Sequence, residues 1–441
     1  MKIILKILSA FFVILLLTLF TSCEKSVPDE IGINPFSNGG KERNMIVVLS
    51  DLHLGSDLDY AETRQNLPSL EKFLKLLKAS ANVKELVIAG DMLDEWYVPA
   101  TIDTYLGKDQ ADFVKRIAAA NKDVFDVLNS IIQEKRILVT YVPGNHDLTI
   151  TEANVNLILP GINQARDPEL GLGTYSPVGN PKIAIEHGHR YNFFCAPDPF
   201  SNQDIAPGTI TPPGYFFSRI GVLHLWQGKP VAGDIIPAVT QNSSCIVSQD
   251  LLYKYWQVWN WALNYLPILN KFNEKIIVTN IDGFTGKYSV NDILPFQKTA
   301  GGLIDVFLYK DIQDTWDQRQ SHNRVAVNIP AARAIVSSTL ESESSEQAKI
   351  QYFLNPTSDV RVVVFGHTHV PKIETSLNHL GQKSIYANSG TWIDHNRLAT
   401  TKMNFVVITP QNGDLSSQTF VKLYNYDNDI VTLMTEETIR F

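Results

Sequence analysis

Cysteine is scarce in this sequence, which has three in 441 residues. A cysteine-rich structural zinc site is therefore not expected. Cys23 belongs to the N-terminal segment discussed below, which leaves Cys195 and Cys245. An oxidising compartment would allow these two to pair, but the sequence does not show that they lie close together, and the pairing stays open.

The sequence also lacks a stripe of lysine and arginine. Its 38 basic and 46 acidic residues give a formal net charge of −8 at pH 7, so we expect no nucleic acid as the main partner. The hydrophobic share of 44% is ordinary for a globular protein. Since the length exceeds that of one simple domain, we expect one core with a large insertion, or two domains.

The apolar run at residues 7–20 is short for a membrane span, which needs roughly 20 residues. Lys2 and Lys6 lie within the positively charged start of the chain, and small residues precede Cys23. This pattern resembles a bacterial lipoprotein signal, so we expect a signal peptide at 1–22 and lipid on Cys23. The alternative is an uncleaved N-terminal anchor. Both alternatives place the body outside the cytoplasm, tethered to a bacterial membrane on its periplasmic or surface side.

Residues 23–44 are rich in polar and turn-forming residues and are expected to be a flexible tether. Five apolar runs then predict buried strands, at 44–50, 83–89, 136–142, 182–185 and 359–365. Helical patterns at about 68–81 and 110–133 separate the first three strands, which indicates an α/β sheet. Sites in such sheets lie at the carboxyl ends of the strands.

Each of these five strands ends in polar residues. The clusters are Asp51 and His53; Asp91 and Asp94; Asn145, His146 and Asp147; His187 and His189; and His367 and His369. In an extended segment positions i and i+2 point the same way, so His367 and His369 are expected to face one site together. The oxygen and nitrogen donors, without thiolate, suit Mn, Fe, Zn or Mg. Their number suits two ions that share a carboxylate.

The motifs Asp-x-His, Gly-Asp-x-x-Asp, Gly-Asn-His-Asp, His-Gly and Gly-His-Thr-His follow one another in this order. Over about residues 45–190 and 359–425 the sequence thereby resembles the calcineurin-like metallophosphoesterase family. The resemblance implies an α/β fold, a four-layer α-β-β-α sandwich, with a dinuclear metal centre at one edge.

The resemblance also implies roles for the motif residues. One metal ion would be held by Asp51, His53, Asp91 and His369, and the other by Asp91, Asn145, His187 and His367, with Asp91 bridging. His146 would stabilise the transition state or protonate the leaving group, and Asp147 would orient it. These roles imply hydrolysis of a P–O bond by in-line attack of metal-bound hydroxide.

Several residues near the motifs have more than one interpretation. Asp94 is expected to cap a turn or orient a ligand rather than bind metal. His189 could support a ligand, face substrate or be exposed, and Arg190 could grip a phosphate or form a salt bridge. The segment 388–392 could return toward the metals or be a simple turn.

The interval between the motifs predicts an inserted, mainly helical cap at 195–358, between core parts at 45–194 and 359–441. Six aromatic residues in a predicted helix at 251–266 could form a cap core or an apolar substrate platform. Residues 337–346 are expected to be an exposed loop. Strands are expected at 384–387, 405–408 and 419–424, with strand character in the tail at 430–441.

The function expected from these features is that of a di-metal phosphoesterase acting on a monoester, diester or pyrophosphate. Its partners would be a phosphorylated small molecule or a lipid-linked substrate, and the membrane through the N-terminal lipid. A nucleotide or cyclic-nucleotide phosphodiesterase is the alternative enzyme. A surface binding protein without turnover is the alternative from another class.

Overall fold

The computed structural model describes residues 34–244, 246–411 and 417–441. The expected signal peptide, Cys23, the first half of the expected tether and Cys245 lie outside the described residues. Residues 34–441 form one compact unit. A search of the described helices finds none with the length and apolar character that a membrane crossing requires.

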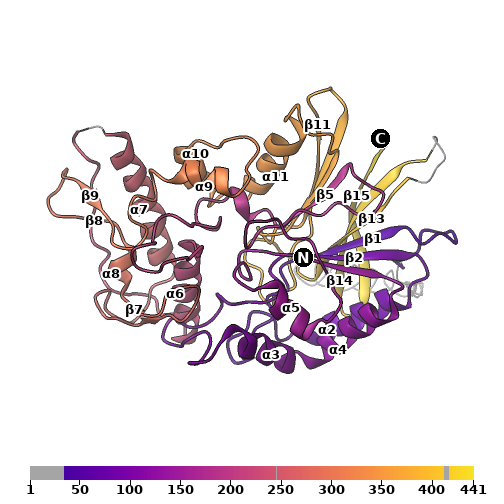
Figure 1. Cartoon of the computed structure of the whole chain (residues 1–441), viewed down its shortest axis with the longest axis horizontal. Coiled ribbons are helices and arrows are strands. Elements are labelled where there is room, and N and C mark those ends of the chain that lie inside the picture. The colour runs from indigo at the N-terminus through magenta and orange to yellow at the C-terminus, as the bar shows by residue number, and fades with distance from the viewer. Residues whose placement is uncertain (1–33, 245, 412–416) are drawn as a thin grey trace, which may run out of the picture. The chain divides into compact units, whose positions relative to one another are not determined.

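Two β-sheets form the centre of this unit (Figure 1). The larger has the strand order β15-β14-β13-β1-β2-β3-β4 and the smaller the order β11-β12-β10-β5. The strands of the larger sheet are β1 (Met45–Leu49), β2 (Val83–Ala89), β3 (Leu138–Val142), β4 (Asn163–Gln164), β13 (Asn404–Thr409), β14 (Thr419–Asp427) and β15 (Ile430–Ile439). Those of the smaller sheet are β5 (Ile183–Ile185), β10 (Val362–Phe365), β11 (Lys372–Leu377) and β12 (Lys383–Asn388).

The two sheets pack face to face through β-branched side chains. Ile46 and Val48 of β1 share one buried cluster with Ile185 of β5 and Val364 of β10. Because side chains alternate along a strand, Val47 points to the opposite face of the larger sheet and joins a second core there.

Helices complete the outer layers and make the predicted four-layer α/β arrangement. The helices beside the larger sheet are α2 (Leu67–Ala79), α3 (Gln110–Ala120), α4 (Lys122–Glu134) and α5 (Glu152–Ile158). The buried faces of these helices share one core with the outward side chains of the sheet. Against the smaller sheet lie α11 (Glu343–Ala348) and the helix η2 (Lys349–Phe353), whose Tyr352 ring contacts Phe365 of β10.

The helical region expected at 110–133 is interrupted. Asn121 has φ −114° and ψ 35°, which ends α3 and begins α4. Its buried side-chain amide donates to the carbonyls of Ile117 and Gly55, so this residue satisfies the end of one helix where the chain changes direction.

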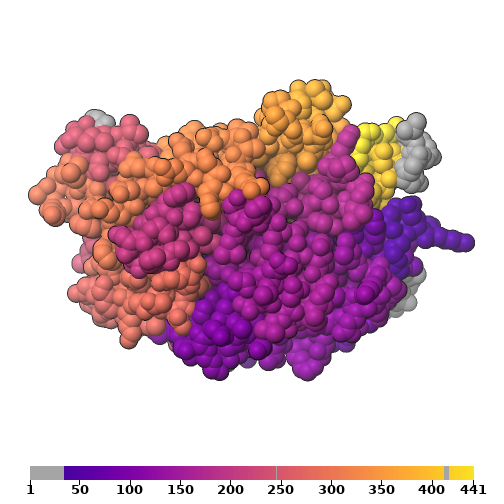
Figure 2. Space-filling view, viewed as in Figure 1, coloured from indigo at the N-terminus to yellow at the C-terminus, as the bar shows by residue number. Residues whose placement is uncertain are grey.

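Helices are the principal regular structure of the interval 195–358, although most of its residues lie in turns and irregular segments. The interval contains α6 (Gly214–Trp226), α7 (Val247–Tyr265), α8 (Val290–Ile293), α9 (Trp316–His322), α10 (Ala331–Ser337) and α11. Two short hairpins accompany them, β6 (Ile277–Val278) with β7 (Lys287–Tyr288) and β8 (Phe296–Gln297) with β9 (Ile304–Asp305). In the space-filling view the residues of this interval, coloured from pink to orange, gather at the left and along the upper edge of the molecule (Figure 2).

The exposed loop predicted at 337–346 is confirmed for residues 338–342, which connect α10 to α11, and is wrong for residues 343–346. Glu343, Ser344 and Ser345 begin α11 and are buried. The Ser/Glu-rich composition suggested that the whole segment is exposed to solvent. The Glu343 carboxyl can nevertheless be buried, because the Asn192 side-chain amide donates a hydrogen bond to it.

Candidate metal centre

The strands that carry the motifs run parallel within each sheet: β1 with β2 and β3, and β5 with β10. Their carboxyl ends therefore meet at one edge. Immediately after the strands the backbone turns into the left-handed region at five polar residues. These are Asp51, His53, Asp91, His367 and His369, with φ of +54°, +43°, +52°, +71° and +58°. Such conformations are uncommon outside glycine and cluster at functional sites, because the surrounding structure must hold them.

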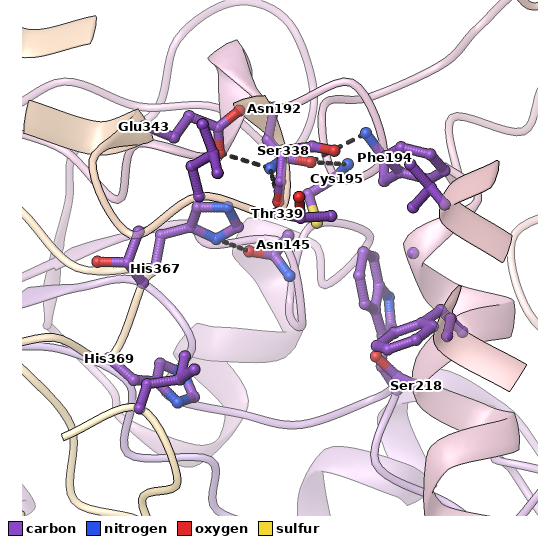
Figure 3. A pocket seen from close by; sticks show the side chains of 18 of the residues that line it. Asn145, Asn192, Phe194, Cys195, Ser218, Ser338, Thr339, Glu343, His367 and His369 are labelled. Carbon is purple, nitrogen blue, oxygen red and sulfur yellow. Dashed lines mark hydrogen bonds between the residues drawn. The ribbon is translucent and has the colours of Figure 1, made fainter. Parts of the chain in front are cut away.

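His367 and His369 reach one centre as expected, but not through the extended backbone on which that expectation was based. The segment after β10 is not extended, so the two rings diverge instead of facing one point. His367 Nδ1 lies 2.9 Å from Asn145 Oδ1 (Figure 3), whereas His369 Nε2 lies 3.1 Å from Asp51 Oδ1.

One group of donors gathers around Asn145. His187 Nε2 lies 3.0 Å from Asn145 Oδ1 and 3.2 Å from Asp91 Oδ2. Together with His367 this makes an amide oxygen, a carboxylate oxygen and two imidazole nitrogens. Metal–ligand bonds of about 2.0–2.2 Å place neighbouring ligand atoms roughly 3 Å apart, so the spacing of these donors matches the edges of a coordination shell.

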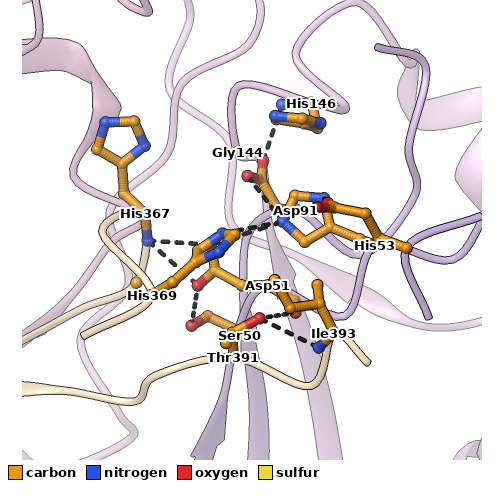
Figure 4. A network of polar contacts seen from close by, with 12 residues as sticks. Ser50, Asp51, His53, Asp91, Gly144, His146, His367, His369, Thr391 and Ile393 are labelled. Atoms are coloured by element: carbon orange, nitrogen blue, oxygen red, sulfur yellow. Dashed lines mark hydrogen bonds and ion pairs between the residues drawn. The ribbon is translucent and has the colours of Figure 1, made fainter. Parts of the chain in front are cut away.

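A second group gathers around Asp51 (Figure 4). His53 Nε2 and His369 Nε2 lie 3.1 Å apart, and the donor atoms of Asp51, His53 and His369 all lie within 4.8 Å of one another. Two imidazole nitrogens that face each other beside a carboxylate form a donor set for a divalent cation.

Asp91 lies between the two groups. Its Oδ2 is 3.2 Å from His187 Nε2 in the first group and 3.7 Å from His53 Nε2 in the second. Its Oδ1 accepts a hydrogen bond from the backbone N–H of His146 at 2.8 Å. Gly144 allows this position, because a Cβ there would lie 2.2 Å from Asp91 Oδ1.

Contacts behind the rings orient two of the histidines for metal binding. His53 Nδ1 lies 2.7 Å from Asp94 Oδ2, and His187 Nδ1 lies 2.9 Å from the Ala89 carbonyl oxygen. A ring that donates from Nδ1 leaves the Nε2 lone pair for the cluster, which is the usual support of a metal-binding histidine.

The charges of the group also fit cations. Burial opposes ionisation of His187, but Asp91 and Asp51 outweigh it and raise the pKa of His187 to about 9. Burial would raise the pKa of Asp91, yet His187 and His146 hold it well below its usual range. The buried carboxylates therefore keep a proton on His187 when no other positive charge is near, and a divalent cation would replace it. The residues present fit divalent metal ions.

His146 is oriented by Asp94 and not by Asp147. Its Nδ1 lies 2.8 Å from Asp94 Oδ1, and its ring packs on Trp96 with centroids 4.8 Å apart. The Asp147 carboxylate accepts backbone N–H groups instead, from Gly144 at 2.7 Å and from Met92 at 2.9 Å. The expected orienting role of Asp147 is therefore corrected: this residue shapes the two loops, and Asp94 holds the imidazole.

Asp94 matches its expected structural role. It accepts from the backbone N–H groups of Trp96 and Tyr97 and contacts the two histidines His53 and His146. Glu62 was not recognised in the sequence, although its Oε2 lies 3.3 Å from His53 Nδ1. It follows no strand and belongs to no motif, so nothing in the local sequence signals it.

Arg190 and His189 do not reach the donor groups. Arg190 is buried in ion pairs with Glu186 at 2.8 Å and Asp167 at 2.9 Å, so the salt-bridge alternative holds and the phosphate-binding alternative does not. His189 is buried behind His187, with ring centroids 5.3 Å apart, and its Nε2 lies 3.0 Å from the Gly171 carbonyl oxygen.

The segment 388–392 returns to the centre and is not a simple turn. The Thr391 hydroxyl and the Trp392 backbone N–H both donate to the Asp51 carbonyl oxygen, at 3.0 and 3.1 Å. Ser389 Oγ lies 2.6 Å from Ser50 Oγ. This segment therefore stabilises the left-handed turn at Asp51 through hydrogen bonds to its backbone carbonyl.

Comparisons with known proteins agree with this geometry over part of the chain. Residues 45–219 match the family model described as calcineurin-like phosphoesterase. No curated protein matches the chain.

Solved structures with some likeness to the chain include two of Vps29 from Entamoeba histolytica, a single mutant and the wild-type protein complexed with zinc. The mutant is 12% identical with a TM-score of 0.29, and the match covers 90% of this chain and 99% of that chain. The wild-type protein is 11% identical with a TM-score of 0.29, covering 90% and 98%. Likenesses at this level carry no argument about function.

Proposed function

From the premise that residues 45–219 place this chain among the calcineurin-like phosphoesterases, we propose that it hydrolyses a phosphoester or pyrophosphate P–O bond at a dinuclear metal centre. The family and the candidate donor groups support a metal-dependent phosphoesterase. The two-ion centre and the turnover are the proposal.

One observation supports two ions above all others: a single carboxylate oxygen faces both donor groups. Asp91 Oδ2 lies near His187 on one side and near His53 on the other. Asp51, His53 and His369 would hold one ion, and Asn145, His187 and His367 the other, with Asp91 between them. Two such ions supply positive charge for the phosphoryl oxygens and lower the pKa of a water molecule.

The protein's own residues supply the remaining chemistry. His146 lies beside the donor groups and borders the adjoining cavity. Because Asp94 holds its Nδ1, the ring presents Nε2 as the nitrogen that can give a proton to the leaving oxygen. Burial opposes protonation of His146, but Asp94 and Asp91 outweigh it and raise its pKa in the absence of metal ions, which favours the protonated ring that such a step requires.

The test is the Asp91→Asn variant. The substitution removes the negative charge that two cations would share but keeps the size and shape of the side chain. We therefore expect the loss of at least one metal ion per chain. Hydrolysis of bis(4-nitrophenyl) phosphate should fall to near background. Elemental analysis and circular dichroism of the same preparations measure the metal content and the fold.

An exposed aspartate serves as the matched control. Asp126 forms an ion pair with Lys122 on the outer face of α4, and Asp126→Asn should keep both the metal and the activity. An active Asp91→Asn protein that retains two metals per chain would refute the bridging role. A wild-type protein that binds metal but turns over no phosphoester would support the binding-protein alternative.

A further inference from the structure

A cavity of about 360 Å³ adjoins the donor groups (Figure 3). Asn145, His146 and His367 border it on the side of the sheets. In Figure 3 the helix that carries Ser218, α6, lies across the cavity from His367. The cavity therefore begins at the centre proposed to bind phosphorus and continues into the interval 195–358.

The wall of the cavity away from the metal centre is mostly apolar. The apolar residues that line it there include Phe217 of α6, Val258, Trp259, Trp261 and Ala262 of α7, and Leu340 and Leu398. Pockets for small molecules commonly measure about 300–1,000 Å³ and combine an apolar lining with a few polar groups. This cavity has a volume in that range, and its lining combines an apolar wall with a few polar groups.

Two of the aromatic residues on the wall keep part of their surface exposed. Phe217 is only partly buried, and the Trp261 side chain is 53% exposed. A large apolar side chain that stays half exposed beside a catalytic centre loses contact with water when a ligand covers it, which stabilises the complex.

The sequence left open whether the aromatic residues of α7 form a cap core or an apolar substrate platform. The structure gives different answers for different faces of the helix. Tyr255 is buried in the core. Trp256 packs on Tyr253 and donates its indole N–H to the Pro237 carbonyl oxygen at 3.2 Å, away from the cavity. Trp259 is buried and also borders the cavity, and Trp261 borders it from the exposed side.

We propose that the substrate is an amphiphilic phosphoester whose phosphoryl group lies at the metal centre and whose apolar group, an alkyl, prenyl or aryl chain, lies between α6 and α7. The hydrolysis of this substrate rests on the proposed function. The binding of its apolar group does not. Phe217 and Trp261 determine specificity, since they contact the chain and not the reacting atoms.

Two phosphodiesters with one leaving group test this proposal: 4-nitrophenyl methyl phosphate and 4-nitrophenyl octyl phosphate, both below the concentration at which the octyl compound aggregates. In the full-length protein we expect KM for the octyl compound to be lower by about tenfold or more, since one methylene in an apolar pocket is worth about tenfold or more. Trp261→Ala and Phe217→Ala should bring the two KM values together. They should leave kcat and KM for the methyl compound nearly unchanged.

Trp256→Ala is the matched control, because it removes the same side chain from the same helix on the face away from the cavity. It should keep the preference for the octyl compound. If Phe217→Ala does not fold, Trp261→Ala still decides the matter, because its side chain is half exposed and contributes less to the core.

Calorimetry with octyl phosphate and methyl phosphate gives a readout that does not depend on turnover. Octyl phosphate could bind more tightly than methyl phosphate, and lose this advantage in Trp261→Ala, in a protein that hydrolyses no phosphodiester, phosphomonoester or pyrophosphate. That result would refute the proposed function and keep this inference. Equal KM values and equal affinities for the two chain lengths would overturn the inference, whatever the activity.

Discussion

Asp94 illustrates how much one side chain arranges at this centre. One oxygen lies 2.7 Å from His53 Nδ1 and the other 2.8 Å from His146 Nδ1. Burial would raise the pKa of this carboxyl, but His146 and His53 hold it far below its usual value. A single ionised carboxylate therefore orients a proposed metal ligand and the proposed general acid at once.

The role of His146 can be separated from metal binding. His146→Gln should keep both metal ions and lower kcat by roughly 10²- to 10⁴-fold, the usual contribution of general acid–base catalysis. If the ring protonates the leaving group, the loss should be smaller for 4-nitrophenyl esters than for alkyl esters. Steady-state rates on the two ester series, with metal analysis of each preparation, measure this.

The exposed His395 provides the matched substitution, and His395→Gln should leave all these rates unchanged. An equal loss on both ester series would assign His146 to charge stabilisation. Loss of metal from His146→Gln would instead make it a ligand.

The ends of the strands determine the geometry of the metal centre. β10 meets β1 so closely at Gly366 that a Cβ there would lie 2.5 Å from Asp51 Oδ2 and from Ser50 Oγ. The backbone N–H of His367 also donates to the Asp51 carboxylate, at 3.1 Å to Oδ2. The two sheets are therefore joined through the carboxylate that one ion would use.

Gly366→Ala should displace Asp51 and weaken metal binding by about 10- to 100-fold, the range for changes in the residues that support metal ligands. Metal titration followed by calorimetry checks this. Gly40→Ala is the control, because the nearest atom to its added Cβ is 3.5 Å away on an exposed loop. Unchanged metal affinity in Gly366→Ala would show that the centre tolerates a shift of Asp51.

The pH dependence of the stability of the whole molecule should reflect one buried carboxyl in the interval 195–358. Burial raises the pKa of Glu343 from about 4.5 to about 8. Asn192 donates to its Oε2 at 2.6 Å, and its buried Oε1 has no hydrogen-bond partner among the described residues. The folded protein thus keeps a proton on this group over a pH range in which the unfolded chain loses it.

Because the folded state binds the extra proton, the free energy of unfolding should fall as the pH rises from about 4.5 to about 8, by roughly a few kcal/mol from this group. Glu343→Gln cannot ionise and should lose this part of the dependence. Urea unfolding of both proteins at several pH values gives the difference. Parallel curves would show that Glu343 ionises normally in the folded protein.

The N-terminal lipid remains a prediction at the scale of the whole chain, since Cys23 lies outside the described residues. We propose that Cys23 is acylated and that the protein is held at a bacterial membrane on the periplasmic or surface side. Cys23→Ser should block processing and leave a precursor heavier by about 2 kDa, the mass of a signal peptide of this length. Electrophoresis after labelling with radioactive fatty acid measures both effects, and equal label on the variant would rule out this site.

The sequence alone determined which donor residues gather at the centre, although it did not indicate Glu62 beside them. Asp51, Asp91, Asn145 and His187 each follow a run of β-branched residues, and strand-forming character and ligand chemistry are both local properties of the chain. Parallel strands bring their carboxyl ends to one edge, so local patterns were enough to predict the cluster. The two facing sheets were expected only from the family resemblance.

Only the tertiary structure decided which group contacts which. The left-handed turns at His367 and His369, the choice of Asp94 over Asp147 as the partner of His146, and the ion pairs of Arg190 all depend on residues from other strands and loops. The same holds for Trp256 and Trp261, whose helical spacing is plain in the sequence. Which face of α7 meets the cavity is set by packing against distant segments, and no local pattern records that.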